Sequence, residues 1–184
     1  MTEKERERMK ISDSIRYVGF DDTELEIFES QYPTGGISYN SYVILDDKIA
    51  IMDTVDARGT DAYFANLKEA LGDKKPSYLI IQHMEPDHAA NIEKLAQMYP
   101  DMELIGSGTV GKLISQFFMS DMQDRFKAVK ENDTLPLGSH TLRFIMAPMV
   151  HWPEVMVTYE ESEKVLFSAD AFGTFGAVAN DEEW

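Results

Sequence analysis

Six consecutive residues near the middle of the chain contain four side chains that can bind a metal ion. The run from His83 to His88 reads His-Met-Glu-Pro-Asp-His and follows the apolar run 78–81. A cluster at the end of a strand lies at the edge of a sheet, where the backbone can hold several ligands rigidly. Two imidazoles and two carboxylates, without a thiolate, suit iron, zinc or manganese better than copper(I) or an iron–sulfur cluster. This stretch therefore indicates a site for one of those three metals.

Two further candidate ligands follow later predicted strands. His151 lies after the strand that ends at Ala147, and Asp170 lies just past the strand over 165–168. If these strand ends converge on the edge that carries His83, the site contains three imidazoles and three carboxylates. That set is enough for two metal ions, because a carboxylate can bridge two ions and an imidazole cannot.

The candidates also have ordinary structural interpretations. Asp87 precedes the predicted helix 89–98 and could act as its N-cap, alone or in addition to binding metal. His151 could be a loop histidine stacked on Trp152, and Asp170 could be a turn aspartate. The pattern of residue types alone leaves these alternatives open.

Two other ionisable residues are expected outside the set of ligands. His140 belongs to Gly138-Ser139-His140, and the tip of a β-turn is an ordinary place for a histidine. Asp53 follows a predicted strand and is expected either in a turn at the strand end or behind the ligands. Because the chain has four histidines, the other three remain as candidate ligands.

Hydrophobic periodicity and turn residues predict the elements that must position these side chains. Residues 1–14 form a charged lead-in, and Asp46-Asp47 separates two strands of a hairpin. Strands come first, strand–helix alternation follows and strands return, an order typical of a layered α/β (or α+β) protein with mixed sheets. The predicted strands are 24–30, 38–45, 48–52, 77–82, 103–106, 126–129, 141–147, 155–159 and 165–168, and the predicted helices are 60–71, 89–98 and 109–118.

Length and composition restrict the class of protein. A chain of 184 residues fits one sizeable domain with a real core, and no linker marks a boundary inside it. The formal net charge of -16 argues against nucleic acid as a partner and against an anionic membrane surface. The absence of cysteine excludes disulfides, iron–sulfur clusters and a thiol nucleophile. We expect a cytoplasmic protein, because neither a signal peptide nor an apolar run of roughly 18 residues is present.

The order of the ligands resembles the metallo-β-lactamase fold family, an αββα sandwich with a dinuclear site at one sheet edge. Hydrolytic members carry His-x-His-x-Asp-His, whereas this chain has Glu85 in place of the second histidine. His-x-Glu-x-Asp-His is similar to the flavodiiron proteins, the branch that reduces oxygen and nitric oxide. The resemblance covers the chain from about residue 15, with supporting matches at 36–42, 85–88, 151–153, 156–159 and 168–173.

The resemblance divides the six candidate ligands between two irons and a bridge. One iron would take His83, Glu85 and His151, the other would take Asp87 and His88, and Asp170 would join them. Replacing an imidazole with a carboxylate adds negative charge and a hard oxygen donor, which favours iron over zinc, although purified protein could contain zinc. Each iron would keep an open position for a diatomic gas. The implied activity is reduction of O2 to water, of NO to N2O, or of both.

The same resemblance implies parts that this chain does not contain. Flavodiiron proteins have a seventh ligand, a histidine well past the bridging aspartate, and no histidine follows His151 here. We therefore expect residues 15–184 to form an incomplete αββα sandwich whose C-terminal strands and helices are missing. We expect the flavodoxin-like domain that carries FMN to be absent from these residues too. Electrons would come from FMN in a missing domain or in a partner chain, supplied by a donor protein of the rubredoxin or flavin reductase type. The family also implies a head-to-tail homodimer, across which the flavin reaches the iron.

Two other functions remain as alternatives. A zinc hydrolase of the lactamase superfamily would cleave an ester, thioester or lactone with a metal-bound hydroxide oriented by Asp87. Glu85 counts against this alternative, because that branch usually has histidine there. A non-enzymatic sensor would bind oxygen at the diiron site without turnover, and the missing flavin domain favours it.

Overall fold

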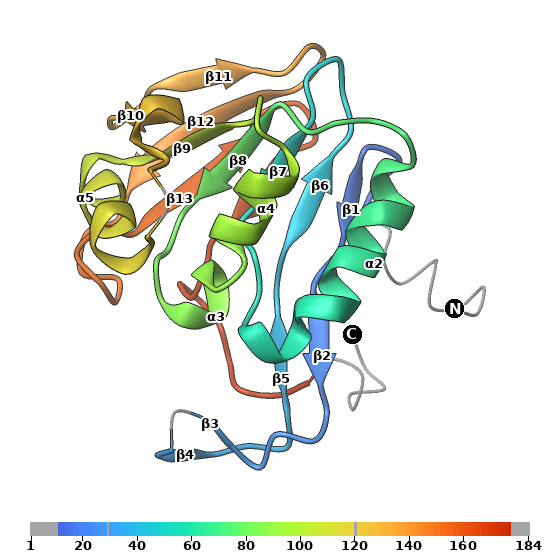
Figure 1. The fold of residues 1–184 in the computed structure, drawn as a ribbon, viewed down its shortest axis with the longest axis vertical. Coiled ribbons are helices and arrows are strands. Elements are labelled where there is room, and N and C mark those ends of the chain that lie inside the picture. The colour runs from blue at the N-terminus through green and yellow to red at the C-terminus, as the bar shows by residue number, and fades with distance from the viewer. Residues whose placement is uncertain (1–10, 29, 120, 178–184) are drawn as a thin grey trace.

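The computed structural model describes residues 11–28, 30–119 and 121–177 (Figure 1). Strands predominate at both ends of this described part, and helices and strands alternate in its middle. The elements are, in order, β1 (Ile15–Tyr17), β2 (Phe20–Asp22), β3 (Ile27–Phe28), β4 (Tyr32–Pro33), β5 (Ile37–Tyr39), β6 (Tyr42–Ile44), β7 (Ala50–Met52), η1 (Ala57–Gly59), α2 (Thr60–Leu71), β8 (Tyr78–Ile81), α3 (Pro86–Ala89), α4 (Ile92–Met98), β9 (Glu103–Ser107), α5 (Gly108–Phe117), η2 (Gln123–Arg125), β10 (Phe126–Val129), β11 (Thr134–Pro136), β12 (Thr141–Met146), β13 (Met156–Glu160) and β14 (Val165–Phe167).

A six-stranded sheet in the order β1-β6-β7-β8-β9-β10 forms the centre of the molecule. The strands β1, β6 and β7 pair antiparallel, whereas β7, β8, β9 and β10 run parallel. Parallel neighbours need crossover connections, which here contain α2, then α3 and α4, then α5. The carboxyl ends of β7, β8 and β9 therefore lie at the same edge of the sheet.

A second, antiparallel sheet has the order β11-β12-β13-β14. Because β12 and β14 both pair antiparallel with β13, these two strands run in the same direction. Their carboxyl ends lie at one end of the second sheet. The loops that carry His151 and Asp170 leave from those ends.

Alternating side chains of the central sheet divide between two apolar cores. On β8, Leu79 and Ile81 pack with the helices, while Tyr78 and Ile80 face the second sheet. Among the described residues, helices cover only the face of the central sheet that points away from the second sheet, so the layers are α, β and β (Figure 1). The core between the sheets also contains Ala50, Met52, Ile105, Leu142, Phe144, Met156 and Phe167.

The helix α2 shows how local sequence forms one of these layers. Tyr63, Leu67 and Leu71 recur at a spacing of four residues and are all buried against the sheet. Gly72 ends the helix with a positive φ of 58°, and its N–H donates to the carbonyl of Lys68. The helix predicted over 60–71 is therefore confirmed.

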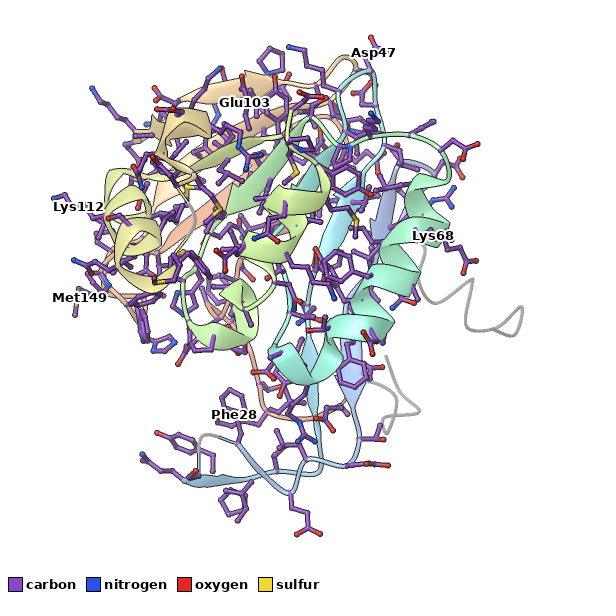
Figure 2. The ribbon with its side chains drawn as sticks, viewed as in Figure 1. Phe28, Asp47, Lys68, Glu103, Lys112 and Met149 are labelled. Atoms are coloured by element: carbon purple, nitrogen blue, oxygen red, sulfur yellow. The ribbon has the colours of Figure 1, made fainter. Side chains whose placement is uncertain are left out.

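An arm formed by short strand pairs extends from the body of the molecule (Figure 1). The strands β2 and β5 form its base, and β3 and β4 form its tip. Phe28, which Figure 2 labels on this arm, has its ring centroid 5.7 Å from that of Phe175. Tyr32 stacks on the same ring at 5.2 Å. The arm thus contacts the segment that follows β14.

The predicted layered α/β arrangement is confirmed, but several predicted boundaries are wrong. The strand predicted over 38–45 is divided at Asn40 into β5 and β6, which belong to different sheets. The helix predicted over 89–98 begins only at Ile92, after the separate turn of α3. The prediction missed β1, β2, β4 and β11, because strands of two or three residues are too short to show alternation.

Two other predictions concern the chain's start and a membrane. Of the predicted lead-in 1–14, only residues 11–14 lie in the described part. None of the helices in the described part is long and apolar enough to cross a bilayer.

An ion pair at the base of the arm leads to a prediction about acid stability. The guanidinium of Arg58 donates to Asp22, which is 4% exposed, and lowers the pKa of that carboxyl. Because the pKa of Asp22 is lower in the folded state, the ion pair adds to the free energy of unfolding above the unfolded pKa of about 3.9. This added stability is lost as pH falls through the folded pKa.

We expect Asp22→Asn to lower the Tm at neutral pH by about 2–4 °C, with the difference vanishing in acid. Asp47→Asn, which removes the same charge from an exposed turn, serves as control. A Tm difference that does not depend on pH would contradict this prediction.

Candidate metal centre

Three loops from the two sheets bring the candidate ligands to one edge of the molecule. His83 and Glu85 follow β8 in the central sheet. His151 lies between β12 and β13, and Asp170 follows β14, both in the second sheet. The strand ends thus converge as the sequence suggested, and the site spans the junction between the sheets.

Four side chains form a compact cluster in which each offers one ligand atom. His83 Nε2 lies 3.1 Å from Glu85 Oε2 and 3.2 Å from Asp170 Oδ2. His151 Nε2 lies 2.9 Å and 3.2 Å from the same two oxygens. All four ligand atoms lie within 4.8 Å of one another. His83 and Glu85 are buried while His151 is exposed, so the cluster has an enclosed side and an open side.

Asp170 connects this cluster to His88 and Asp87. Its Oδ2 faces the cluster, whereas its Oδ1 is 2.8 Å from His88 Nε2. Asp87 Oδ2 lies 3.8 Å from the same nitrogen of His88. Oδ2 of Asp170 therefore faces the Nε2 atoms of His83 and His151, and Oδ1 faces that of His88, as in a carboxylate that bridges two ions.

The short helix α3 presents Asp87 and His88. It begins at Pro86, which suits the first helical position because its missing N–H would be unpaired there. The N–H and Oγ1 of Thr54 both donate to the carbonyl of His88, at 2.9 and 2.7 Å, and join α3 to the end of β7. Asp87 lies inside α3, and Asn91 precedes α4, so the alternative in which Asp87 caps the helix 89–98 is wrong.

Two further buried carboxylates contact the imidazoles from outside the cluster. Glu154 Oε1 is 2.8 Å from His83 Nδ1. Asp53 Oδ2 is 3.6 Å from His88 Nδ1, and the Asp53 carboxylate also accepts hydrogen bonds from the backbone and side-chain amides of Gln82. Each of these two histidines thus has a carboxylate beside Nδ1, while its Nε2 faces the site.

Carboxylates and imidazoles shift one another's pKa values here. Burial disfavours the imidazolium forms, but the surrounding carboxylates outweigh it and raise the pKa of His83 to about 11 and that of His88 to about 10. Burial also opposes ionisation of Asp170, yet hydrogen bonds from these histidines hold its pKa far below the usual range. Burial raises the pKa of Asp87 to about 6. A cation that bound here would therefore displace protons from the imidazoles.

The donor set fits a divalent transition metal. Imidazole nitrogens and carboxylate oxygens without sulfur suit iron, zinc or manganese. Asp87 Oδ1 is buried and has no hydrogen-bond partner among the described residues. Such an oxygen is costly unless a donor or cation satisfies it, and a metal beside Asp87 would do so.

A cavity of about 590 Å³ adjoins the candidate ligands. Its polar wall contains the carboxylates of Glu85, Asp87 and Asp170. Another part of its lining is aromatic and includes Phe28 and Tyr32 of the arm. A cavity with one apolar side and a few convergent polar groups is the usual form of a ligand site.

The structure also decides the remaining interpretations of single residues. The ring of Trp152 lies closer to that of His83, at 5.4 Å between centroids, than to that of His151, at 6.4 Å. Stacking on Trp152 therefore does not explain the position of His151, which contacts two carboxylates. His140 precedes β12, at the opposite end of that strand from His151, and contacts Glu160, as expected for a residue outside the site.

Sequence reasoning missed Glu154. This residue is 1% exposed and lies three positions after His151, just before the buried strand β13. An acidic residue next to a predicted buried strand is the signal that could have identified it, because a carboxylate is rarely buried without a partner.

The chain matches the model of a known protein family over most of its length. That family is described as ODP family beta lactamase, and the match covers residues 37–184.

Curated relatives are similar over nearly the whole chain. The flavo-diiron protein FprA2 of Clostridium acetobutylicum is 36% identical over 167 residues, which are 90% of this chain and 42% of that protein. The anaerobic nitric oxide reductase flavorubredoxin of Salmonella arizonae is 36% identical over 89% of this chain and 34% of its own length. The chain thus spans well under half the length of these relatives.

Solved structures give the same similarity in three dimensions. Rubredoxin oxygen:oxidoreductase from Desulfovibrio gigas has a TM-score of 0.85 and 33% identity, covering 91% of this chain and 42% of that one. The flavodiiron protein from Giardia intestinalis has a TM-score of 0.83 and 26% identity, covering 92% and 41%. The expected metallo-β-lactamase-like fold and the resemblance to flavodiiron proteins are therefore confirmed.

The geometry of the cluster leads to a prediction about metal affinity. Replacing His83 with alanine removes one of the four clustered ligand atoms. We expect the affinity for Fe(II) or Zn(II) to fall by at least about 100-fold, because losing a ligand costs more than losing a hydrogen bond that supports a ligand. Competition with a coloured chelator measures this affinity. His140→Ala, which removes a histidine outside the cluster, should leave it unchanged. Equal losses in the two variants would contradict the assignment.

Proposed function

Because the chain belongs to the ODP family of β-lactamase-like proteins, we propose that it is the diiron part of an oxidoreductase that reduces O2 to water, NO to N2O, or both. The similarity to flavodiiron proteins over 90% of the chain supports this proposal. So does the similarity to a nitric oxide reductase and to an oxygen oxidoreductase.

One observation carries the proposal: the carboxylate of Glu85 lies in the cluster beside two imidazoles. Hydrolytic relatives of this fold have a neutral imidazole at the corresponding place in the motif. A carboxylate adds negative charge and a hard oxygen donor, so it favours iron over zinc and stabilises the ferric state. A site that must pass between ferrous and ferric states benefits from this change, whereas a zinc hydrolase does not.

The proposed ligand sets follow the two groups of contacts. His83, Glu85 and His151 would hold one iron, Asp87 and His88 would hold the other, and Asp170 would bridge them. The division of the Asp170 oxygens between the two groups supports this assignment. When bound, the two irons would supply redox chemistry for a diatomic gas.

The chain's own residues prepare the site for that chemistry. The buried side chain of His83 excludes water from one side of the cluster. On the other side, the cavity of about 590 Å³ offers a route for a small apolar gas, because part of its lining is aromatic. Glu154 holds the imidazole of His83 from outside, and the Asp53 carboxylate lies 3.6 Å from His88 Nδ1.

Electrons must reach the site from a redox group other than the candidate ligands. Reduction of O2 to two water molecules takes four electrons and four protons, and conversion of two NO molecules to N2O and water takes two of each. The chain has no cysteine, so it cannot form a rubredoxin-like centre of its own. We propose that reduced FMN on another domain or chain is the donor, supplied by a protein of the rubredoxin or flavin reductase type and reached across a head-to-tail homodimer.

Gas consumption by the iron-loaded chain tests this function. The protein is purified anaerobically, loaded with Fe(II) and given reduced free FMN, and O2 or NO is followed with an electrode. We expect consumption above that of FMN and Fe(II) alone. Consumption of neither gas would overturn the proposal, as would zinc-dependent turnover of a thioester or lactone.

Glu85→His tests the role of the carboxylate. We expect this variant to lose at least about tenfold in gas consumption and to bind Zn(II) more tightly relative to Fe(II), because imidazole replaces the hard oxygen donor. Glu69→His, in the exposed face of α2, makes the same substitution away from the site and serves as control. An unchanged preference between the metals in Glu85→His would show that Glu85 does not select iron.

A further inference from the structure

Glu154 is a buried carboxylate outside the proposed ligand sets. It lies in the loop between His151 and β13 and is 1% exposed. Burying an ionised carboxylate costs several kcal/mol unless hydrogen bonds replace the lost water. The contacts of Glu154 must therefore explain its position.

The contacts of Glu154 join the loop of the second sheet to the central sheet. Its Oε1 lies 2.8 Å from His83 Nδ1 and also accepts a hydrogen bond from the backbone N–H of Met84 at 2.9 Å. Its backbone carbonyl accepts a hydrogen bond from Ser107 Oγ at 2.8 Å. The carboxylate is therefore held at the end of β8, and its backbone at the end of β9.

These contacts determine which nitrogen of His83 faces the cluster. With Nδ1 donating to Glu154, Nε2 is the nitrogen left to bind a metal. Nε2 points at the cluster, where it lies 3.1 Å from Glu85 Oε2 and 3.2 Å from Asp170 Oδ2. The ring of Trp152 meets that of His83 edge-on, with 88° between the planes, and packs beside the imidazole.

We propose that Glu154 is a positioning residue for the metal centre, which holds the imidazole of His83 in the Nδ1–H tautomer with Nε2 toward the metal. The proposal rests on the metal site of the proposed function, but it does not depend on which gas is reduced. A carboxylate behind a ligand histidine fixes the orientation of the ring and makes the imidazole a stronger donor, and its loss typically lowers metal affinity by about 10- to 100-fold.

The second oxygen of Glu154 allows a conservative substitution. Oε2 has no hydrogen-bond partner among the described residues. Glu154 also lines a small cavity of about 430 Å³ with Thr109 and Lys112, the latter labelled at the margin of the molecule in Figure 2. An amide at position 154 can therefore keep its oxygen at Oε1 and place its NH2 group at the Oε2 position without displacing a donor.

Metal affinity of two variants tests the proposal. Glu154→Gln keeps the acceptor for Nδ1 but removes the charge, so we expect affinity for Zn(II) and Co(II) to fall by about tenfold. Glu154→Leu removes the acceptor as well, so we expect a loss of about 100-fold and a changed visible spectrum of the Co(II) form. Glu160→Gln is a control outside the site, because Glu160 is a buried carboxylate 3.1 Å from His140 Nδ1. The two oxygens of Glu160 also accept the backbone N–H groups of Ser162 and Glu163, so its Tm is compared as well. Circular dichroism and the Tm of the metal-free variants show whether each one folds.

The tautomer of His83 provides a measurement that a merely structural role would not change. In the Zn(II)-loaded wild type, nitrogen–proton correlation NMR should show a proton on Nδ1 of His83 that exchanges slowly with water. In Glu154→Leu this signal should shift or exchange faster, and in Glu154→Gln it should persist. Because the wild-type spectrum alone can contradict the proposal, a variant that fails to fold does not prevent the test.

The outcomes separate this proposal from the proposed function. Wild-type affinity and spectra in Glu154→Leu, or binding of Zn(II) through Nδ1 of His83 in the wild type, would overturn the role of Glu154 alone. Gas consumption would then still decide the proposed function. If the wild type binds no metal, and His83→Ala changes nothing, the metal centre and the role of Glu154 are both wrong.

Discussion

The packing of the two sheets against each other is the interaction on which the candidate site depends. His83 and Glu85 stand at the edge of the central sheet, whereas His151 and Asp170 come from loops of the second sheet. The apolar layer between the sheets, which includes Ile80, holds these edges together. Burying one such side chain contributes about 1.5–3 kcal/mol. A layer of them supplies the free energy that brings several ionisable groups into contact.

Charge compensation is the second constraint on this edge. Imidazoles and carboxylates alternate through the site, so each buried group has an oppositely charged or hydrogen-bonding neighbour. Asp170 is the centre of this arrangement, because His83, His88 and His151 all contact its carboxylate.

The outer carboxylates show that the two sheets also cooperate in orienting the ligands. Asp53 lies beside His88 within the central sheet, at 3.6 Å between Oδ2 and Nδ1, since both residues follow strands of that sheet. Glu154 supports His83 across the junction, because it belongs to the second sheet and contacts the ends of β8 and β9. The orientation of the His83 imidazole is thus coupled to the packing of the sheets. This coupling connects the stability of the fold to the geometry of the proposed metal centre.

The sequence by itself determined the local features of this protein. The motif from His83 to His88 indicated metal binding, and the apolar spacing of 60–71 predicted α2 with its bounds. Only the tertiary structure decided that 38–45 divides between two sheets. It also decided that the two oxygens of Asp170 contact different imidazoles, and that Glu154 contacts Nδ1 of His83. The reason is the range of the contacts. Helix periodicity and strand ends depend on neighbours within a few residues, whereas the contacts of Asp170 and Glu154 join residues 82 and 71 positions apart, and their partners are set by how the sheets pack.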